Sequence, residues 1–264
     1  MNISVLEDND LAGIPSLQPP GWPDILPPFK MYLSQPFCYP LKIMDQSRLT
    51  GVGAAIIFHS TAWLGHIIVD EKCRGLGWGK LMTEHLVELC LKKSVTTISL
   101  IATDLGFPIY QKLQFVPETE YAYWQGTPRE QHAFNGIYPA SAADLPYLAD
   151  LDQRMNAENR KPLLDLHANN IMIYKTDGLI RGAYWPELGE GLIVAEDEEA
   201  GIALTSWRGQ HQQNASFPIN NLAAMNYYEQ AGYRFIRQAW RMYWGNPLDW
   251  SPTKLYHRIA GNLG

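Results

Sequence analysis

The sequence is poor in cysteine and has neither a long apolar run nor a cluster of basic residues. Its cysteines, Cys38, Cys73 and Cys90, are odd in number and lack the spacing of a metal site. This pattern predicts a reducing compartment and no bound metal. The longest apolar runs, such as residues 54–58, are far shorter than the roughly 20 residues that cross a bilayer, so we expect no membrane association.

The charge balance excludes another class of partner. The net charge is −6 and no run of Lys or Arg is present, which argues against binding to nucleic acid or to an anionic membrane. The N-terminal residues include Glu7, Asp8 and Asp10 and lack the basic-then-apolar pattern of a secretory signal. We therefore expect a cytoplasmic globular protein, and its 264 residues allow one large or two small domains.

Residues 62–91 join a strand, a glycine-rich turn and a helix. Residues 63–69 are apolar and β-branched, as in a buried strand. Three alternating glycines follow, and from Trp78 onward apolar residues recur at helical spacing: Trp78, Met82, Leu86 and Leu89. Glycine lets backbone N–H groups converge on a ligand, and a helix N-terminus adds unpaired donors with partial positive charge. The stretch therefore predicts a phosphate-binding turn.

Two common phosphate motifs do not fit this turn. The P-loop pattern fails because position 74 is Arg and position 81 is Leu, and the dinucleotide fingerprint fails because position 80 is Lys. The pattern that fits is Arg-x-x-Gly-x-Gly, at Arg74, Gly77 and Gly79. It resembles the acetyl-CoA pyrophosphate loop of the GNAT superfamily of N-acetyltransferases. The alternative is an ordinary strand-to-helix turn in which glycine serves only the geometry.

A second segment extends the resemblance. Residues 97–102 read as another buried strand, and residues 102–115 resemble the GNAT segment in which a short helix carries a tyrosine. Tyr110, Leu113 and Phe115 match the Tyr-x-x-Leu-Gly-Phe pattern, whereas Gln114 replaces the usual glycine. That replacement predicts a different cap at the end of this helix.

The second half of the chain resembles the same superfamily more weakly. Residues 221–233 are similar to the tyrosine helix, at Asn221, Ala224, Tyr228, Gly232 and Tyr233. No Arg-x-x-Gly-x-Gly motif precedes them; instead four carboxylates follow a predicted strand, at Glu196, Asp197, Glu198 and Glu199. Because these charges would repel a pyrophosphate, we expect one acetyl-CoA site per chain.

The resemblance implies an α+β protein of two tandem GNAT-like domains, each with a mixed, mainly antiparallel sheet flanked by helices. The predicted domains are residues 1–126, which carry the acetyl-CoA loop, and residues 132–264, which are divergent, with a polar boundary at residues 126–131. Residues 152–160, residues 241–245 and the closing Ile-Ala-Gly-Asn-Leu-Gly are similar to a two-part GNAT subgroup.

The implied activity is acetyl transfer from acetyl-CoA, as co-substrate, to a primary amine of a small molecule, by a monomer or homodimer. The implied cofactor-binding residues are Ile67, Ile68, Val69, Arg74, Gly75, Leu76, Gly77, Trp78, Gly79, Lys80, Thr103 and Tyr110. Of these, Ile67 to Val69 would offer free backbone N–H groups on a strand that splays from its neighbour. Trp22, Phe29 and Trp63 are candidate substrate contacts, although such residues also plug loops onto cores.

Tyr110 is the candidate general acid that protonates the departing thiolate; its alternative role is that of a core residue. The general base is not evident, because the strand positions that hold it in many relatives are Trp63 and Gly65. His66 is expected on the other face of the sheet, since strand neighbours alternate. Glu71 is a candidate base, and a water chain or a partly neutral amine would need none.

Two rival functions remain open from the sequence. A non-catalytic acyl-CoA-binding sensor or scaffold would use the same loop without turnover. Tyr110 favours the enzyme, whereas the lack of an obvious base leaves the sensor open. A nucleotide-dependent oxidoreductase is disfavoured, because the fingerprint and its acidic ribose ligand are absent.

Overall fold

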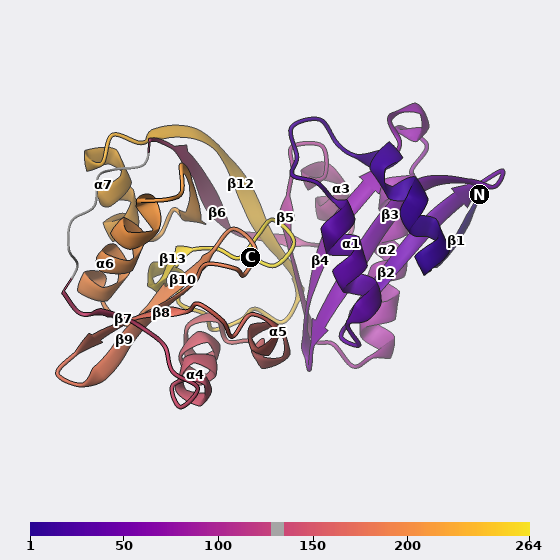
Figure 1. Cartoon of the computed structure of the whole chain (residues 1–264). Coiled ribbons are helices and arrows are strands. Elements are labelled where there is room, and N and C mark those ends of the chain that lie inside the picture. Colours follow the sequence, from indigo (N-terminus) through magenta and orange to yellow (C-terminus); the bar gives the residue numbers. More distant parts are fainter. Residues whose placement is uncertain (128–134) are drawn as a thin grey trace. The chain divides into compact units, whose positions relative to one another are not determined.

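The computed structural model describes residues 1–127 and 135–264 and divides into two compact units (Figure 1). Unit 1 comprises residues 1–117, 242–247 and 261–263, and unit 2 comprises residues 118–241, 248–260 and Gly264. The sequence predicts a division into residues 1–126 and 132–264, and part of that predicted boundary, residues 128–131, lies outside the described residues. Two late segments of the chain thus belong to unit 1.

The elements follow the predicted mixture of strands and helices, and the α+β class is confirmed. Unit 1 holds β1 (Asn2–Val5), η1 (Asp8–Leu17), α1 (Leu26–Ser34), β2 (Cys38–Asp45), β3 (Arg48–Phe58), β4 (Thr61–Val69), η2 (Glu71–Cys73), α2 (Trp78–Lys92), β5 (Thr97–Ala102) and α3 (Phe107–Lys112). Unit 2 holds most of β6 (Val116–Gln125), then β7 (Ile137–Pro139), α4 (Leu145–Asn156), α5 (Lys161–Leu166), β8 (Met172–Thr176), β9 (Leu179–Trp185), β10 (Leu192–Ala195), α6 (Glu198–Gly209), β11 (Asn214–Pro218), α7 (Leu222–Gln230), η3 (Pro252–Lys254) and β13 (Leu255–His257). Strand β12 (Arg234–Gly245) begins in unit 2 and ends in unit 1.

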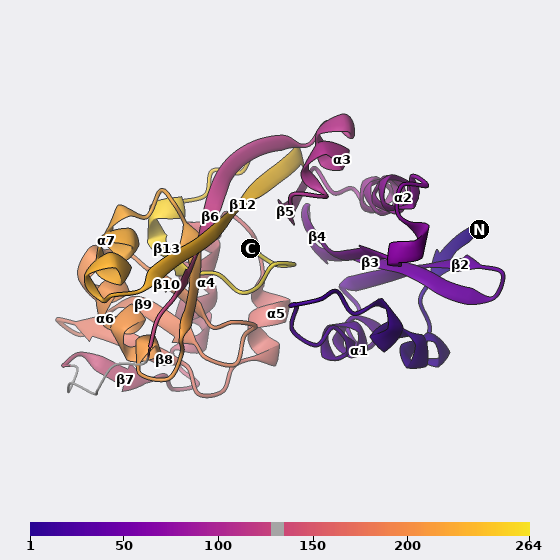
Figure 2. The ribbon, with the colours of Figure 1, turned by 90° about the horizontal axis from the view of Figure 1, so that it is seen from above.

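The sheet of unit 1 runs in the order β1-β2-β3-β4-β5, antiparallel except for the parallel pair β4–β5. Helix α1 covers one face, and α2 and α3 cover the other (Figure 2). Helix α2 turns Met82, Leu86 and Cys90 inward, and these pack with Leu64 of β4 in one apolar core. Fully burying such side chains contributes about 1.5–3 kcal/mol each, so the face that α2 presents fixes its position on the sheet.

The residue that follows β12, Asn246, is joined to the start of β5 by two hydrogen bonds. The N–H of Asn246 donates to the carbonyl of Thr96 (3.0 Å), and the hydroxyl of Thr97 donates to the carbonyl of Asn246 (2.8 Å). At Gly245, whose φ is 87°, an added Cβ would overlap the carbonyl oxygen of Thr96. Glycine is therefore required where this segment meets the start of β5.

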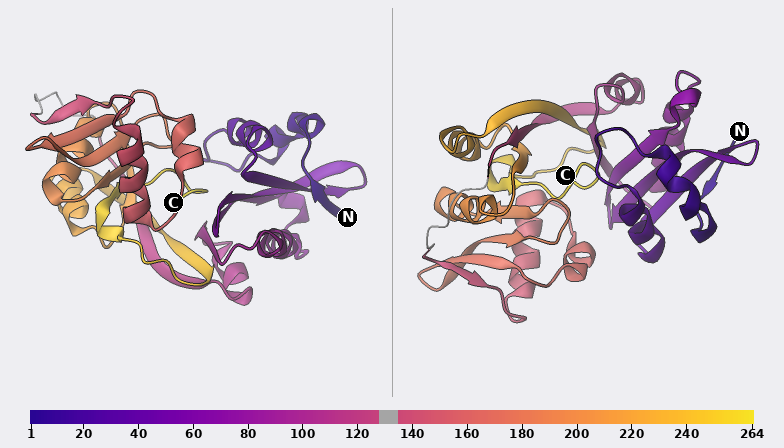
Figure 3. Two further views of the ribbon diagram at one scale, coloured as in Figure 1. Left: turned by 90° about the horizontal axis from the view of Figure 1, so that it is seen from below. Right: turned by 45° about the horizontal axis from the view of Figure 1, so that its top comes forward.

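Unit 2 is built around a second antiparallel sheet, in the order β13-β10-β9-β8-β7. Helices α6 and α7 lie on one side of it and α4 on the other (Figures 1 and 3). Antiparallel β6 and β11 complete the unit, and their inward residues share one core with α6 and α7. Tyr228 of α7 stacks on Phe217 of β11, with centroids 5.2 Å apart, and is 1% exposed. The tyrosine helix of this half thus serves packing.

The segment of residues 152–160 forms a buried ionic cluster in unit 2. Arg160 donates from Nη2 to Oδ1 of Asp152 (2.5 Å) and from Nε to Oδ2 (3.0 Å), and Asn156 donates to Asp152 Oδ1 (2.9 Å). The pair joins α4 to the loop before α5. Removing one partner would leave a buried charge without its counter-charge, which is strongly destabilising.

Among residues 1–127 and 135–264, no helix combines the length and apolar character that crossing a membrane requires.

Candidate functional site

The central feature of unit 1 is an open edge on β4. Strand β4 pairs with β5 only at its start, from Thr61–Thr97 to Trp63–Ser99. Both strands continue beyond that point, to Val69 and Ala102, so they diverge. The second half of β4 therefore has hydrogen bonds to β3 on one side, and on the other side no strand among the described residues pairs with it.

The pairing with β3 decides which N–H groups face this open edge. The N–H of Asp70 donates to the carbonyl of Thr50 (2.8 Å), and Ile68 pairs with Val52. Because successive N–H groups of an antiparallel strand point in opposite directions, those of Ile67 and Val69 point to the open side and that of Ile68 points to β3. The sequence predicts free N–H groups at Ile67, Ile68 and Val69. By this pairing, Ile67 and Val69 have N–H groups on the open edge and Ile68 does not.

A β-bulge interrupts β4 at His66. The register with β3 shifts between Val52–Ile68 and Ala54–Gly65, and His66 has a left-handed φ of 51°. Its ring lies near those of Phe29 and Trp22, with centroids 5.7 and 6.3 Å away, on the α1 side. The expectation that His66 faces away from Gly65 is therefore wrong, because the bulge breaks the alternation on which it rested.

The glycine turn follows β4 directly. Gly75 and Gly77 have φ values of 80° and 81°, and a Cβ at either position would meet no atom within 4 Å. Gly77 forms the left-handed N-cap of α2 without a side-chain cap, and its carbonyl accepts from Leu81 N (3.0 Å). The first N–H groups of a helix have no partner within it, so the backbone donors of residues 78–80 are not engaged inside α2.

Side chains around the turn are held by ion pairs at the surface. Arg74 pairs with Glu71 (Nη1 to Oε1, 3.1 Å) and Lys80 pairs with Glu84 (3.3 Å). Arg48 pairs with Asp70 (2.8 Å), whose carboxylate also accepts from the N–H of Lys72. Exposed pairs of this kind contribute little stability, so Arg74 and Lys80 are available to a competing anion. Glu71, a predicted base candidate, is engaged with Arg74.

Helix α3, which carries Tyr110, lies beside the start of α2. A Cβ on Gly79 would lie 3.8 Å from Ile109 and 3.8 Å from Val69, so the end of β4, the start of α2 and α3 meet there. Tyr110 packs its ring on Phe115, with centroids 5.8 Å apart. Burial raises the pKa of Tyr110 to about 12. Its hydroxyl therefore keeps its proton at neutral pH and can act as an acid.

Both ends of α3 have defined caps. The hydroxyl of Thr103 accepts from the N–H of Gly106 (3.2 Å), so this predicted cofactor residue also orders the turn before the helix. Gln114 adopts φ 66°, and the N–H of Phe115 reaches back to the carbonyl of Tyr110 (3.0 Å). Glutamine thus occupies the left-handed position that glycine favours, and the chain keeps the same kind of helix end.

The predicted substrate contacts differ in accessibility. Trp22 is 40% exposed, whereas Phe29 and Trp63 are fully buried. At Gly65, one of the two positions examined for a base, an added Cβ would overlap Cβ of Asn262, which belongs to unit 1. Sequence reasoning missed Asn262 and Tyr32 as neighbours of His66, because no local pattern connects positions so far apart in the chain.

The corresponding place in unit 2 is built differently. Asp197 caps α6 by accepting from the N–H of Ala200 (2.9 Å). Glu196 accepts from Arg154 (2.9 Å) and Arg181 (3.2 Å). The hydrogen bonds from both arginines outweigh the effect of burial and lower the pKa of Glu196. The start of α6 therefore carries a carboxylate cap where a phosphate would need free donors.

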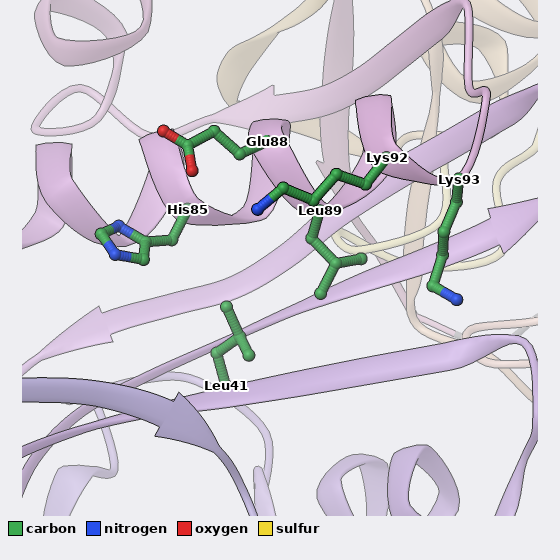
Figure 4. Close-up of a pocket in the computed structure, with 6 residues that line it drawn as sticks. All are labelled: Leu41, His85, Glu88, Leu89, Lys92 and Lys93. Carbon is green, nitrogen blue, oxygen red and sulfur yellow. The ribbon is translucent and has the colours of Figure 1, made fainter.

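A shallow apolar pocket lies elsewhere on unit 1. It is lined by Leu41 of β2 and by α2 with the residue after it, namely His85, Glu88, Leu89, Lys92 and Lys93 (Figure 4). Lys93 lies over the ring of Tyr39, with Nζ 4.1 Å from the centroid. None of the predicted site residues lines this pocket.

In the part of the chain that the structure describes, no group of three or more His, Cys, Asp or Glu side chains could hold a metal.

The part of the chain that holds β4, the glycine turn and α3 matches a known protein family. Residues 9–112, which include the turn and Tyr110, match the family model described as acetyltransferase (GNAT) family. This part of the chain is thus similar to the GNAT acetyltransferase family. The same residues contain the open edge of β4 and the glycine turn, whereas Gln114, Phe115, Asn262 and the start of α6 lie outside the match. No curated protein matches the chain.

Solved structures show that the GNAT fold extends over the whole chain. A candidate acetyltransferase from Pyrococcus horikoshii is 18% identical with a TM-score of 0.87, covering 100% of this chain and 95% of that one. A GCN5-related N-acetyltransferase from Sphaerobacter thermophilus is 11% identical with a TM-score of 0.63, covering 96% and 98%. A fungal GCN5-related glucosamine N-acetyltransferase region is 12% identical with a TM-score of 0.67, covering 92% and 38%. The predicted tandem architecture is confirmed at the level of fold.

Proposed function

We propose that unit 1 is an acetyl-CoA-dependent N-acetyltransferase that acts on a primary amine of a small molecule. The observation that carries the proposal is the continuity of the open edge of β4 with the glycine turn and the first turn of α2. An open strand edge can pair with the amide groups of a pantetheine arm as it would with another strand. The turn that follows offers N–H groups to the pyrophosphate.

The chemistry of the proposed reaction needs few protein groups. The neutral amine nitrogen attacks the thioester carbon, a C–N bond forms and the C–S bond breaks. The N–H groups of Ile67 and Val69 are the proposed donors to the thioester oxygen as it gains charge. The hydroxyl of Tyr110 gives its proton to the departing thiolate. The amine loses its proton to water, and water returns a proton to Tyr110.

A second candidate is a non-catalytic acyl-CoA sensor. The residues at the positions considered for a general base favour it, because none of them is placed to accept a proton. Trp63 is buried, Gly65 lies against Asn262, and Glu71 pairs with Arg74. The two functions share the loop and differ in turnover. The raised pKa of Tyr110 and the position of its helix, α3, beside the start of α2 support Tyr110 as an acid. They therefore support the enzyme.

Thiol release from acetyl-CoA tests the proposal directly. The panel of acceptors would contain alkylamines, amino-acid amides and amino sugars; the last are included because the fungal structure is that of a glucosamine N-acetyltransferase region. Release that depends on one class of amine, with acetylated product found by mass spectrometry, supports the enzyme. Tight acetyl-CoA binding in calorimetry without amine-dependent release supports the sensor.

A further inference from the structure

Three side chains from remote parts of the sequence form a hydrogen-bonded relay within unit 1. The hydroxyl oxygen of Tyr32 on α1 lies 2.7 Å from Nδ1 of His66 at the bulge of β4. Nδ2 of Asn262 lies 2.5 Å from the same oxygen. Tyr32 is 1% exposed and Asn262 is 9% exposed, so both act inside the unit. The proposed reaction has no role for any of the three.

The direction of each hydrogen bond follows from the groups involved. The amide nitrogen of Asn262 only donates, so the oxygen of Tyr32 accepts from it. The single proton of Tyr32 then points to His66, whose Nδ1 must be an unprotonated acceptor. In a neutral imidazole the other nitrogen carries the proton. The relay therefore fixes His66 as the tautomer with Nε2–H.

The surroundings keep this arrangement unchanged at neutral pH. Burial lowers the pKa of His66 to about 4, so the ring is neutral. Burial raises the pKa of Tyr32, against the opposing effect of the hydrogen bond from Asn262 and with a smaller contribution from Cys38. Trp22 and Phe29 add no charge. Nε2 of His66 has no hydrogen-bond partner among residues 1–127 and 135–264, and the ring is only partly buried.

The location of this unused donor links it to the proposed reaction. His66 directly precedes Ile67, whose N–H faces the open edge where the thioester would lie. Its ring lies on the α1 side, near the ring of Trp22, which is 40% exposed. Nε2 has no lone pair in this tautomer, so it cannot take the proton of the amine. It can donate a hydrogen bond to a molecule that approaches from this side.

We propose that His66 Nε2–H is a specificity contact that binds an oxygen of the acceptor, and that Tyr32 and Asn262 are positioning residues that hold its tautomer. This inference rests on the proposed acetyl transfer. It narrows the acceptor to amines that carry a carbonyl, carboxylate or hydroxyl oxygen near the amino group. Gly65 has a matching role, because only glycine leaves room for Asn262 beside β4.

The tautomer can be measured without any substrate. In protein labelled with ¹⁵N-histidine, long-range ¹H–¹⁵N spectra at pH 7 report which nitrogen carries the proton, and His66→Phe assigns the signal. We expect Nδ1 to be unprotonated. In Asn262→Asp the carboxylate accepts the proton of Tyr32, so Nδ1–H of His66 must donate to Tyr32 and the tautomer reverses. Protonated Nδ1 in the wild type, or an unchanged tautomer in folded Asn262→Asp, would overturn the relay.

Two further variants guard against misfolding of Asn262→Asp. Tyr32→Phe keeps the ring but removes the hydroxyl, and Asn262→Ala removes the amide. Each should shift the Nδ1 signal of His66 while the melting curve stays cooperative, and Tyr32→Phe should shift it more because it deletes the direct partner. If both fold and neither shifts the signal, the assignment of Tyr32 and Asn262 as positioning residues is wrong.

The substrate contact is tested with a matched pair of acceptors, alaninamide and isopropylamine, which differ in the carbonyl amide. Because their amino groups have different pKa values, kcat/KM is expressed per concentration of neutral amine. The wild type should prefer alaninamide by about tenfold to a hundredfold in kcat/KM, the usual effect of losing a hydrogen-bond partner in a site. His66→Phe and Asn262→Asp should raise KM for alaninamide and remove the preference, with KM for acetyl-CoA unchanged. A preference that survives His66→Phe contradicts the contact. Failure to acetylate either of these amines, or any other amine, contradicts the proposed function. The proposed acceptor contact is then contradicted as well, whereas the tautomer measurement remains valid because it needs no substrate.

Discussion

The hydroxyl oxygen of Tyr32 lies 2.7 Å from Nδ1 of His66, although the two residues belong to a helix and a strand separated by β2 and β3. This contact exists because a bulge turns His66 toward α1. The same stretch of β4 also carries the open backbone edge. One irregularity in a strand thus places a side chain and free N–H groups within one site.

We expect His66 to remain neutral down to about pH 4, because burial disfavours its charged form. Its ordinary pKa in the unfolded chain is about 6.5, so between these values the unfolded state binds more protons. The contribution to stability is thus constant above about pH 6.5 and declines as the pH falls toward 4. An NMR titration of the folded protein should show no His66 transition between pH 5 and 8, whereas the urea-unfolded chain should titrate near 6.5. His257, whose pKa is also lowered by burial, acts in the same direction, so His66→Phe is needed to isolate the effect of His66 on stability.

Gly77→Asp should weaken CoA binding by about tenfold or more, since it places bulk and negative charge in the open space at the start of α2. Calorimetry with CoA measures the effect. Gly178→Asp is the matched control, because Gly178 has a similar φ of 77° and equally open surroundings in a turn of unit 2. Equal CoA affinity in the two folded variants would remove the glycine turn from the proposed site.

Tyr110→Phe keeps the ring that packs on Phe115 and deletes the proton. If chemistry limits the rate, turnover should fall by about 10²–10⁴, the usual size of a general-acid effect, with little change in CoA affinity. Steady-state kinetics with a thiol assay provides the measurement. Undiminished turnover under those conditions would make Tyr110 a packing residue only.

Gln114→Gly should stabilise unit 1 by about 0.5–1 kcal/mol. The left-handed conformation costs a residue other than glycine roughly 1–2 kcal/mol, and Gln114→Gly removes this cost. The greater conformational freedom of glycine in the unfolded chain opposes the gain by roughly 0.5–1 kcal/mol. Gln111→Gly, within the right-handed part of α3, should destabilise by about 1 kcal/mol. Urea unfolding of both variants compares the two; destabilisation by Gln114→Gly would contradict the assigned helix end.

Titration with CoA should give one site per chain. The carboxylates at the start of α6 are engaged by Ala200 N–H, Arg154 and Arg181, and their negative charge disfavours a phosphate there. Glu196→Gln and Asp197→Asn should leave the stoichiometry and affinity unchanged. Two equivalent sites in calorimetry, or affinity lost in these variants, would show that unit 2 binds CoA.

The sequence by itself determined the strand, turn and helix of residues 62–91, because each of their signals is local. Alternating glycines permit left-handed φ values at Gly75 and Gly77 whatever surrounds them, and the apolar spacing from Met82 to Leu86 selects the buried face of α2. Tyr110 was found in another way, through the resemblance of residues 102–115 to a GNAT segment in which a short helix carries a tyrosine.

Only the tertiary structure decided how His66, Tyr32 and Asn262 come together. The face on which His66 lies depends on a bulge, which arises from pairing with β3 and reverses the alternation expected from the strand alone. Asn262 reaches Tyr32 because the last segment of the chain packs in the space that Gly65 leaves. Such contacts depend on shape and packing between distant segments, and residue type and spacing along the chain carry no record of them.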